Sequence, residues 1–210
     1  WLPAEARYVA PEDAVARLAR ARFALLGEKH DNADHHRLQA WLVERLTASR
    51  RPAIALEAID RSQERALQGF LAERPNDADG IGAALAWQKS GWPPWRHYAP
   101  IVRPVLAQGG PLLATQPGRS TLRAVFRKGV AALPPARVRA LGLETDLPPA
   151  DRKVLLRAIA EGHCNQLPEA MAGPMATVQR VKDAAMADAL IRGAAASGRD
   201  MAVLIAGNGQ

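Results

Sequence analysis

The sequence contains a single cysteine, and this scarcity restricts the sites that the chain can hold. Cys164 has no second thiol among the 210 residues, which excludes an intramolecular disulfide and a cysteine-built zinc cluster. A His-Glu-x-x-His motif, typical of zinc hydrolases, is also absent. We expect the lone thiol to be a buried apolar residue rather than a ligand.

Long apolar runs and blocks of like charge are missing as well. No uninterrupted apolar stretch approaches the length of a membrane span. The net charge is +7, but the arginines are scattered without any long block of like charges, so a nucleic-acid-binding tail is not expected. A diffuse basic surface remains compatible with anionic ligands, membranes or protein partners. The chain has no initiator methionine and no signal peptide, and we expect a mature or trimmed product.

The composition otherwise suits a globular protein, with 48% hydrophobic residues and 5% aromatic ones. Apolar runs with the length of buried strands occur at residues 23–26, 52–56, 111–115 and 200–206. Their carboxyl ends are expected near Gly27, Glu57, Thr115 and Gly207. Residues 119–197 have a mainly helical pattern, with helices expected at 119–128, 135–141, 149–161 and 174–196. The sequence thus predicts a three-layer α/β domain with a parallel sheet of at least four strands and a large helical insertion.

The most informative stretch is the turn that follows the first apolar run. Three of the five histidines lie there, namely His30, His35 and His36. Asp31 or Asn32 can cap the helix that follows. In an α/β sheet this turn is the carboxyl end of a strand, where ligands usually bind.

The two adjacent histidines of this turn must point in different directions, because neighbouring helical residues diverge by about 100°. His35 has the spacing of Leu38 and Leu42, so we expect it to face inward, as a core, interface or ligand-binding residue. His36 is expected to face solvent or a partner subunit.

Two other polar residues, Glu57 and Gln210, follow apolar runs as His30 does. Glu57 could orient His30, accept a hydrogen bond from a ligand or act as a base; alternatively, it is a structural acid at a helix N-terminus. His30 could likewise serve only to bond the next loop. Because the carboxyl ends of parallel strands meet at one edge, we expect His30, Glu57 and Gln210 to converge on one cleft.

A family resemblance begins in the same stretch. Gly27-Glu28-Lys29-His30-Asp31-Asn32, followed by His35-His36, resembles the opening motif of the ChaN-like haem-binding uptake proteins. These belong to the superfamily of the Tiki metalloproteases and are related to erythromycin-esterase-like proteins. Further segments match in the same order: Ala55-Leu56-Glu57, Ser90-Gly91-Trp92-Pro93, Gly162-His163-Cys164 and Ala206-Gly207-Asn208-Gly209. The resemblance extends over residues 1–210 as a single ChaN-like domain.

The resemblance implies haem as the cofactor of a protein that is not an enzyme, held in a cleft at the carboxyl ends of the strands. The residues expected to contact it are His30, His35, Glu57, Trp92, His97 and Tyr98. Tryptophan faces and a phenol suit a porphyrin, and tyrosine is an accepted axial ligand of ferric haem. Tyr98 is therefore the first choice for the iron ligand and His30 the alternative. The Trp92–Tyr98 stretch could instead be a local core that pins a proline-rich loop.

The resemblance also implies a role in iron uptake, a homodimer that encloses two stacked haems, and a cell-envelope location. The envelope protein would be a lipoprotein, associated with the membrane through a lipid anchor outside this chain. Two alternatives stay open. One is a metal-dependent hydrolase resembling the Tiki proteases or erythromycin esterases, with His30, Glu57 and Glu28 at its centre. The other is an inactive interaction domain of the same fold.

The chain departs from the superfamily pattern at its last residue. The second Gly-x-x-His motif would have histidine at the position of Gln210. Glutamine is a poor ligand for a catalytic transition metal, so this change weakens the hydrolase hypothesis more than the haem-binding one. The last expected strand has no following element, and we therefore expect the natural chain to continue.

Overall fold

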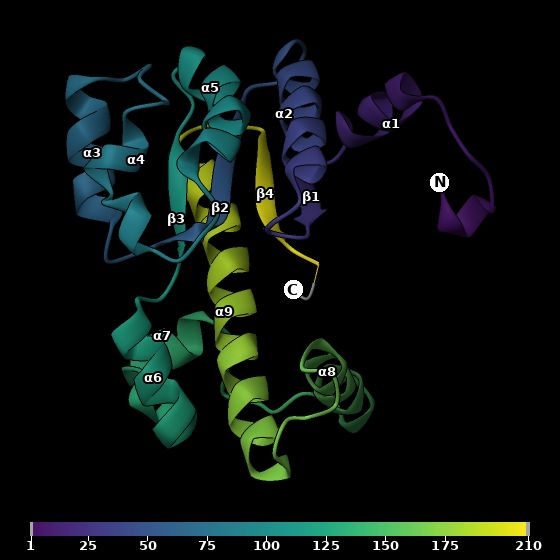
Figure 1. Ribbon diagram of the computed structural model, residues 1–210, viewed down its shortest axis with the longest axis vertical. Helices are drawn as coiled ribbons and strands as arrows, with labels where there is room; N and C mark the ends of the chain where they lie inside the picture. The colour runs from purple at the N-terminus through teal and green to yellow at the C-terminus, as the bar shows by residue number, and fades with distance from the viewer. Residues whose placement is uncertain (1, 209–210) are drawn as a thin grey trace.

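The predicted strands form one parallel sheet in the computed structural model, which describes residues 2–208 (Figure 1). The strands are β1 (Phe23–Glu28), β2 (Pro52–Asp60), β3 (Leu112–Gln116) and β4 (Met201–Gly207), in the order β1-β4-β2-β3. The central strand β2 is buried on both faces, as expected where helices cover both sides of a parallel sheet. The three-layer α/β architecture is therefore confirmed.

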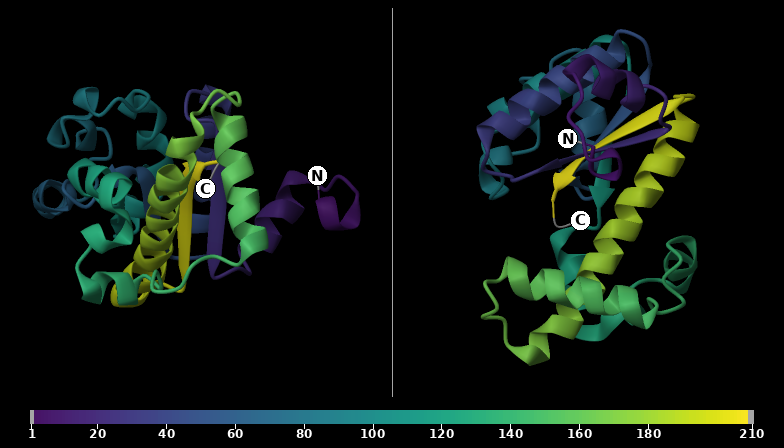
Figure 2. Two further views of the ribbon diagram at one scale, coloured as in Figure 1. Left: turned by 90° about the horizontal axis from the view of Figure 1, so that it is seen from below. Right: turned by 90° about the vertical axis from the view of Figure 1, so that its right-hand side faces the viewer.

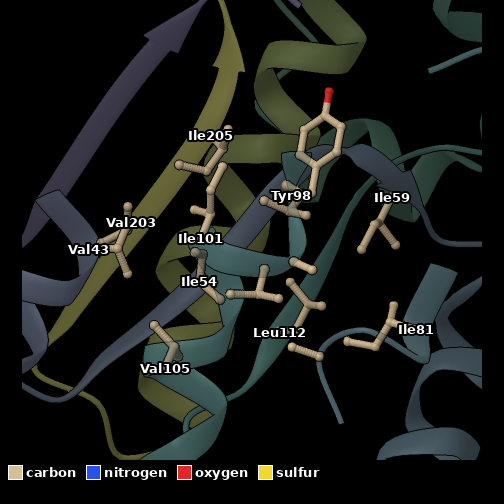
Figure 3. Packing of buried hydrophobic residues seen from close by; sticks show 14 of the residues in the cluster. Val43, Ile54, Ile59, Ile81, Tyr98, Ile101, Val105, Leu112, Val203 and Ile205 are labelled. Atoms are coloured by element: carbon tan, nitrogen blue, oxygen red, sulfur yellow. The ribbon is translucent and has the colours of Figure 1, made fainter. Parts of the chain in front are cut away.

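One face of the sheet is covered by α2 (Ala33–Thr47) and α5 (Ala99–Ala107), and α3 (Glu64–Glu73) lies beyond β3 on the side of α5. The large apolar side chains lie in this layer; Figure 3 shows Val43, Ile54, Ile101 and Ile205 packed together with Tyr98. The Asn32 side chain caps α2 by accepting hydrogen bonds from the amides of Asp34 and His35. The main core thus lies between the sheet and the two helices α2 and α5, directly beneath the histidine turn.

The other face is covered by the long helix α9 (Glu169–Ala196), which Figure 2 shows on the side opposite to α2. Small residues face it from the sheet, namely Ala53, Ala55, Ala202 and Ala206. They allow the helix to approach closely, and Met186 and Leu190 fill the remaining space. Leu25 of the edge strand β1 is 68% exposed, so this face of β1 is less completely covered than that of β2.

The segment before α9 is helical, as the sequence predicts. It contains α6 (Arg119–Lys128), η4 (Gly129–Ala132), α7 (Pro135–Ala140) and α8 (Pro149–Gly162). These elements lie beyond the carboxyl edge of the sheet around the first half of α9 (Figure 1). A separate small core, made of Val125, Leu133, Leu143 and Val181, joins them to that helix. The first half of α9 therefore belongs to the helical segment and its second half to the sheet.

The remaining elements are short. They are η1 (Pro3–Glu5), α1 (Pro11–Leu18), α4 (Ile81–Ala84), η2 (Trp87–Lys89) and η3 (Trp95–His97). Within residues 2–208, no helix is both long enough and apolar enough to cross a membrane.

Three local expectations are wrong. First, β2 runs on to Asp60, although its pairing with β4 ends at Leu56, and the Glu57 carboxylate therefore projects from within the strand. Second, the buried face of α2 contains His36, with Gln39, Val43 and Leu46 at helical spacing, whereas Leu38 is 58% exposed. Third, Cys164 is exposed rather than buried, because α8 ends at Gly162 and the thiol lies in the turn beyond it.

The turn between α5 and β3 gives a test of this packing. A Cβ atom added to Gly110 would lie 2.8 Å from the carbonyl oxygen of Val105 and 2.9 Å from that of Pro52. Neither backbone atom can move cheaply, so we expect Gly110→Ala to lower the free energy of unfolding by about 1–3 kcal/mol, measured by urea denaturation. Gly69→Ala is the matched control, because an added Cβ meets nothing within 4 Å there. A control as destabilised as Gly110→Ala would contradict the packing described.

Candidate site at the carboxyl edge of the sheet

Two buried carboxylates mark the edge where the strands end. Glu28 is the last residue of β1 and pairs in register with Gly207 of β4. Glu57 lies in β2, one residue beyond the last pair with β4. Their residues are 2% and 4% exposed, which is uncommon for ionisable side chains unless these have partners.

Glu28 contacts three side chains that come from separate elements. Its Oε1 atom accepts hydrogen bonds from His30 Nδ1 at 2.8 Å and from the Tyr98 hydroxyl at 3.3 Å. Its Oε2 atom lies 3.3 Å from His36 Nδ1 with no hydrogen bond between them, and His36 Nε2 donates to the backbone oxygen of His30. The carboxylate thus fixes the His30 ring directly, while His36 separately holds the turn that carries it.

Glu57 is bound by donors from three other elements. Its Oε2 atom accepts from the backbone amide of Gly207 at 2.8 Å. Its Oε1 atom accepts from Gln116 Nε2 and from Lys182 Nζ, each at 3.0 Å. Burial by itself would raise the pKa of Glu57, but the Lys182 charge and the Gly207 amide outweigh it, so the pKa lies below its usual value. Glu57 is therefore ionised and joins α9 to the ends of β3 and β4.

His30 is the accessible member of this cluster. Its side chain is 38% exposed, and the ring of Trp92 meets it edge-on at 4.6 Å between centroids. Because Nδ1 donates to Glu28, the neutral ring leaves Nε2 as the acceptor, 3.9 Å from the nearest oxygen of Glu57. A Cβ atom on Gly207 would lie 2.8 Å from Nε2, so the imidazole packs directly against this glycine and no larger residue fits there. The hydrogen bond to Glu28, opposed by burial and supported by the charge of Glu57, raises the pKa of His30.

Tyr98 lies beneath His30 rather than beside it. The residue is 1% exposed, and Figure 3 shows its ring in the core with its oxygen pointing toward the carboxyl ends of the strands. Burial, followed by the nearby charge of Glu28, raises the pKa of the phenol far above its usual value. The hydroxyl is therefore a neutral donor to Glu28.

The structure brings His30, Glu57, Trp92 and Tyr98 to one edge but separates His35 and His97 from them. His35 Nδ1 accepts a hydrogen bond from the amide of Lys29 and so braces the turn. His97 lies behind His36, with the two rings stacked at 5.5 Å. Gln210 lies outside the described residues, so its convergence with His30 and Glu57 stays a prediction.

Sequence reasoning did not anticipate Gln116 and Lys182, and it expected His36 to face solvent or a partner subunit rather than this cluster. A signal for His36 was present, because it precedes Gln39, Val43 and Leu46 at the spacing of one helix face. No comparable signal marks Lys182 or Gln116, which lie 125 and 59 residues from Glu57 along the chain. Only the packing of α9 and β3 brings them to that carboxylate.

Comparison with known proteins agrees with this arrangement. The family model of haem-binding uptake proteins of the Tiki superfamily, ChaN, matches residues 14–209. The chain belongs to the ChaN family.

The fold agrees with this assignment. The solved structure of Campylobacter jejuni ChaN, described as binding haem cofacially, superposes with a TM-score of 0.75 at 23% sequence identity. The match covers 97% of this chain and 77% of the Campylobacter chain. No curated protein sequence matches the chain.

The donor set of this ChaN-family chain suits haem iron. Within residues 2–208, no group of three or more histidine, cysteine, aspartate or glutamate side chains is arranged to hold a metal ion. Haem iron needs fewer protein ligands than a bare metal ion, because the porphyrin supplies the equatorial nitrogens and one side chain suffices as an axial ligand. His30, whose Nδ1 is held by Glu28 and whose side chain is 38% exposed, is the histidine of this edge that could supply such a ligand.

An apolar cavity of about 360 Å³ adjoins the same edge on the α9 face of the sheet. It is lined by Leu25, Met186, Leu190 and Leu204, with Asp183 and Gly207 at the end nearest Glu57. Asp183 accepts a hydrogen bond from Gln179 at 2.8 Å, and burial raises its pKa. Gly207 thus borders both this cavity and the space beside His30.

Proposed function

We propose that this ChaN-family chain binds ferric haem at the carboxyl edge of the sheet, with His30 Nε2 as the axial ligand. The observation that carries the proposal is the hydrogen bond from His30 Nδ1 to the buried carboxylate of Glu28. Metal-binding histidines characteristically make this second contact, because it fixes the tautomer and makes the other nitrogen more basic. Haem, when bound, would supply an iron centre that this nitrogen can coordinate.

The surrounding residues have distinct tasks in this proposal. Trp92 offers an aromatic surface next to His30 and shields one side of the imidazole from water. Glu57 and Lys182 hold the end of β4 in place, and Gly207 leaves room for the imidazole of His30. The apolar lining that begins at Gly207 suits the hydrocarbon part of a porphyrin.

Several broader features belong to the same proposal. A role in iron uptake and a cell-envelope location, with membrane association through a lipid anchor, rest on the family resemblance. The homodimer that encloses stacked haems is supported by the description of the Campylobacter ChaN structure as a cofacial haem complex. These features are consistent with a cargo-binding protein, since no step of catalysis is needed to hold haem.

A second candidate function is hydrolysis of an ester or peptide, and one observation favours it. A histidine oriented by a buried carboxylate is also the usual arrangement of a general base. In that case His30 Nε2 would take a proton from water, and Glu28 would stabilise the resulting imidazolium. Hydrolysis of model esters, measured with and without added zinc, separates this candidate from haem binding.

The haem proposal is tested by titrating the protein with ferric haem and following its visible absorption spectrum. We expect saturable binding with a shifted main absorption band in wild type. Tyr98→Phe should leave the band position unchanged, because the phenol is buried against Glu28 and phenylalanine keeps its ring packing. If Tyr98→Phe shifts the band to that of a differently ligated haem, Tyr98 is the iron ligand and the proposed role of His30 is wrong. Absence of any band shift in wild type would reject haem binding itself.

A further inference from the structure

A second cavity, of about 550 Å³, lies between α2 and α5, on the far side of His36 from His30. Its charged and aromatic lining includes Arg37, Trp41, Glu44, Arg96, His97 and Arg103. Neither His30 nor Glu57 lines it, and the stacked pair of His36 and His97 separates it from the edge of the sheet. It is therefore a separate concavity and not an extension of the haem site.

The charge of this groove is unbalanced. Three guanidinium groups line it, whereas Glu44 is its one acidic lining residue. Arg37 and Arg103 pair with Asp34 and Asp79, but both pairs are exposed, and exposed pairs exchange partners at little cost.

Arg96 is the group most ready to bind an anion. Among residues 2–208, it has no hydrogen-bond or ion-pair partner for its side chain. It lies in η3, directly before His97, and it is exposed. An unpaired arginine beside a concave surface can form a bidentate contact with a carboxylate or a phosphate.

The groove also has a flat apolar wall. Trp41 is half-buried, and the guanidinium of Arg45 lies 5.7 Å from its ring centre. Pro100 and Pro104 line the groove from α5, and their rings present a rigid apolar surface. A planar ring placed against this wall would bring its acidic groups to the arginines.

We propose that the groove between α2 and α5 binds a planar aromatic anion, with Arg96 as its main charge contact and Trp41 as its stacking surface. The anionic groups could be carboxylates, as on a porphyrin, or phosphates, as on a nucleotide, because arginine recognises both in the same way. This site goes beyond the proposed haem ligation and does not depend on it, since no iron ligand is involved.

The experiment uses two probes, metal-free protoporphyrin IX and ATP, each titrated into the protein and followed by quenching of tryptophan fluorescence. Lacking iron, the porphyrin cannot use His30 as a ligand. We expect at least one probe to bind saturably, and the probe that binds tells carboxylate from phosphate recognition. Arg96→Glu should weaken that binding by about tenfold or more, since a charge-assisted contact becomes a repulsive one.

Arg65→Glu is the matched control, because Arg65 is exposed on α3, lies outside the groove and gives the same change in net charge. It should change the affinity by no more than about twofold. Equal effects of the two variants would reduce the binding to general electrostatic attraction and overturn the proposal. So would a failure of both probes to bind, or porphyrin binding that Arg96→Glu leaves unchanged, which would place the porphyrin elsewhere.

Discussion

Replacing His30 with alanine is expected to abolish the shifted haem absorption band and to reduce haem affinity by about 100-fold or more. The reason is that His30 is the accessible histidine at the edge of the sheet and the proposed axial ligand, with Nδ1 held by Glu28. Because the His30 side chain is 38% exposed, its loss should not unfold the protein. The measurement is a ferric haem titration, together with a circular dichroism spectrum that verifies folding.

Glu28→Gln is expected to have a haem affinity between those of wild type and His30→Ala. A purely structural role of His30 would not produce this graded loss. The amide keeps the shape of the side chain but weakens the contact that orients the imidazole, so we expect a loss of about 10–100-fold with the absorption band retained. His163→Ala is the matched control, because this histidine is exposed at the end of α8 and bonds only to the backbone of Ile159. If His30→Ala binds haem as wild type does while His163→Ala does not, the axial ligand lies in the helical segment.

The largest loss of stability is expected from Glu57→Ala, at about 3–5 kcal/mol in the free energy of unfolding. The substitution leaves the charge of Lys182, the amide of Gln116 and the backbone amide of Gly207 without their carboxylate partner. Lys182 is 19% exposed, so it can regain only part of its hydration. Urea denaturation measures the difference, and Glu73→Ala, at an exposed position of α3, should stay within about 0.5 kcal/mol of wild type.

The same variant has a defined pH dependence. The pKa of Glu57 is lower in the folded protein than its usual value of 4.5, so folding favours the ionised form. This stabilisation is complete at pH values above 4.5 and is lost as the pH falls through the folded-state pKa. The stability difference between wild type and Glu57→Ala should therefore shrink on acidification. A difference that stays constant from about pH 7 to about pH 3 would show that Glu57 acts through packing alone.

The fold could be predicted well because its signals are local. Apolar runs of strand length at residues 23–26 and 200–206 each stop at a glycine, and prolines separate the helices between residues 119 and 197. β1, β4 and α6 were observed at or close to the predicted positions. The hydrophobic pattern that predicts each of these elements lies within the element's own segment, so it can be recognised from the sequence without the tertiary structure.

The orientation of α2 shows where local reasoning failed. Leu38 and Leu42 suggested an inward face, yet the neighbouring face with His36 and Gln39 is the one buried. His36 is buried because it contacts Glu28 and the backbone of His30, and Gln39 because it donates to the carbonyl of Leu26. A helix that covers the end of a sheet buries polar side chains where strand ends offer them partners, which a hydrophobic pattern cannot display.

The sequence by itself determined that this chain has parallel strands with Glu28, His30 and Glu57 close to their carboxyl ends, because strand length, glycine turns and polar ends are properties of short segments. The tertiary structure decided which of these groups is accessible. It buried Tyr98 beneath Glu28, left His30 half-exposed beside Gly207, and brought Lys182 to Glu57 from 125 residues away. Burial and long-range pairing depend on how the helices pack on the sheet, and packing arises from the chain as a whole rather than from any one segment.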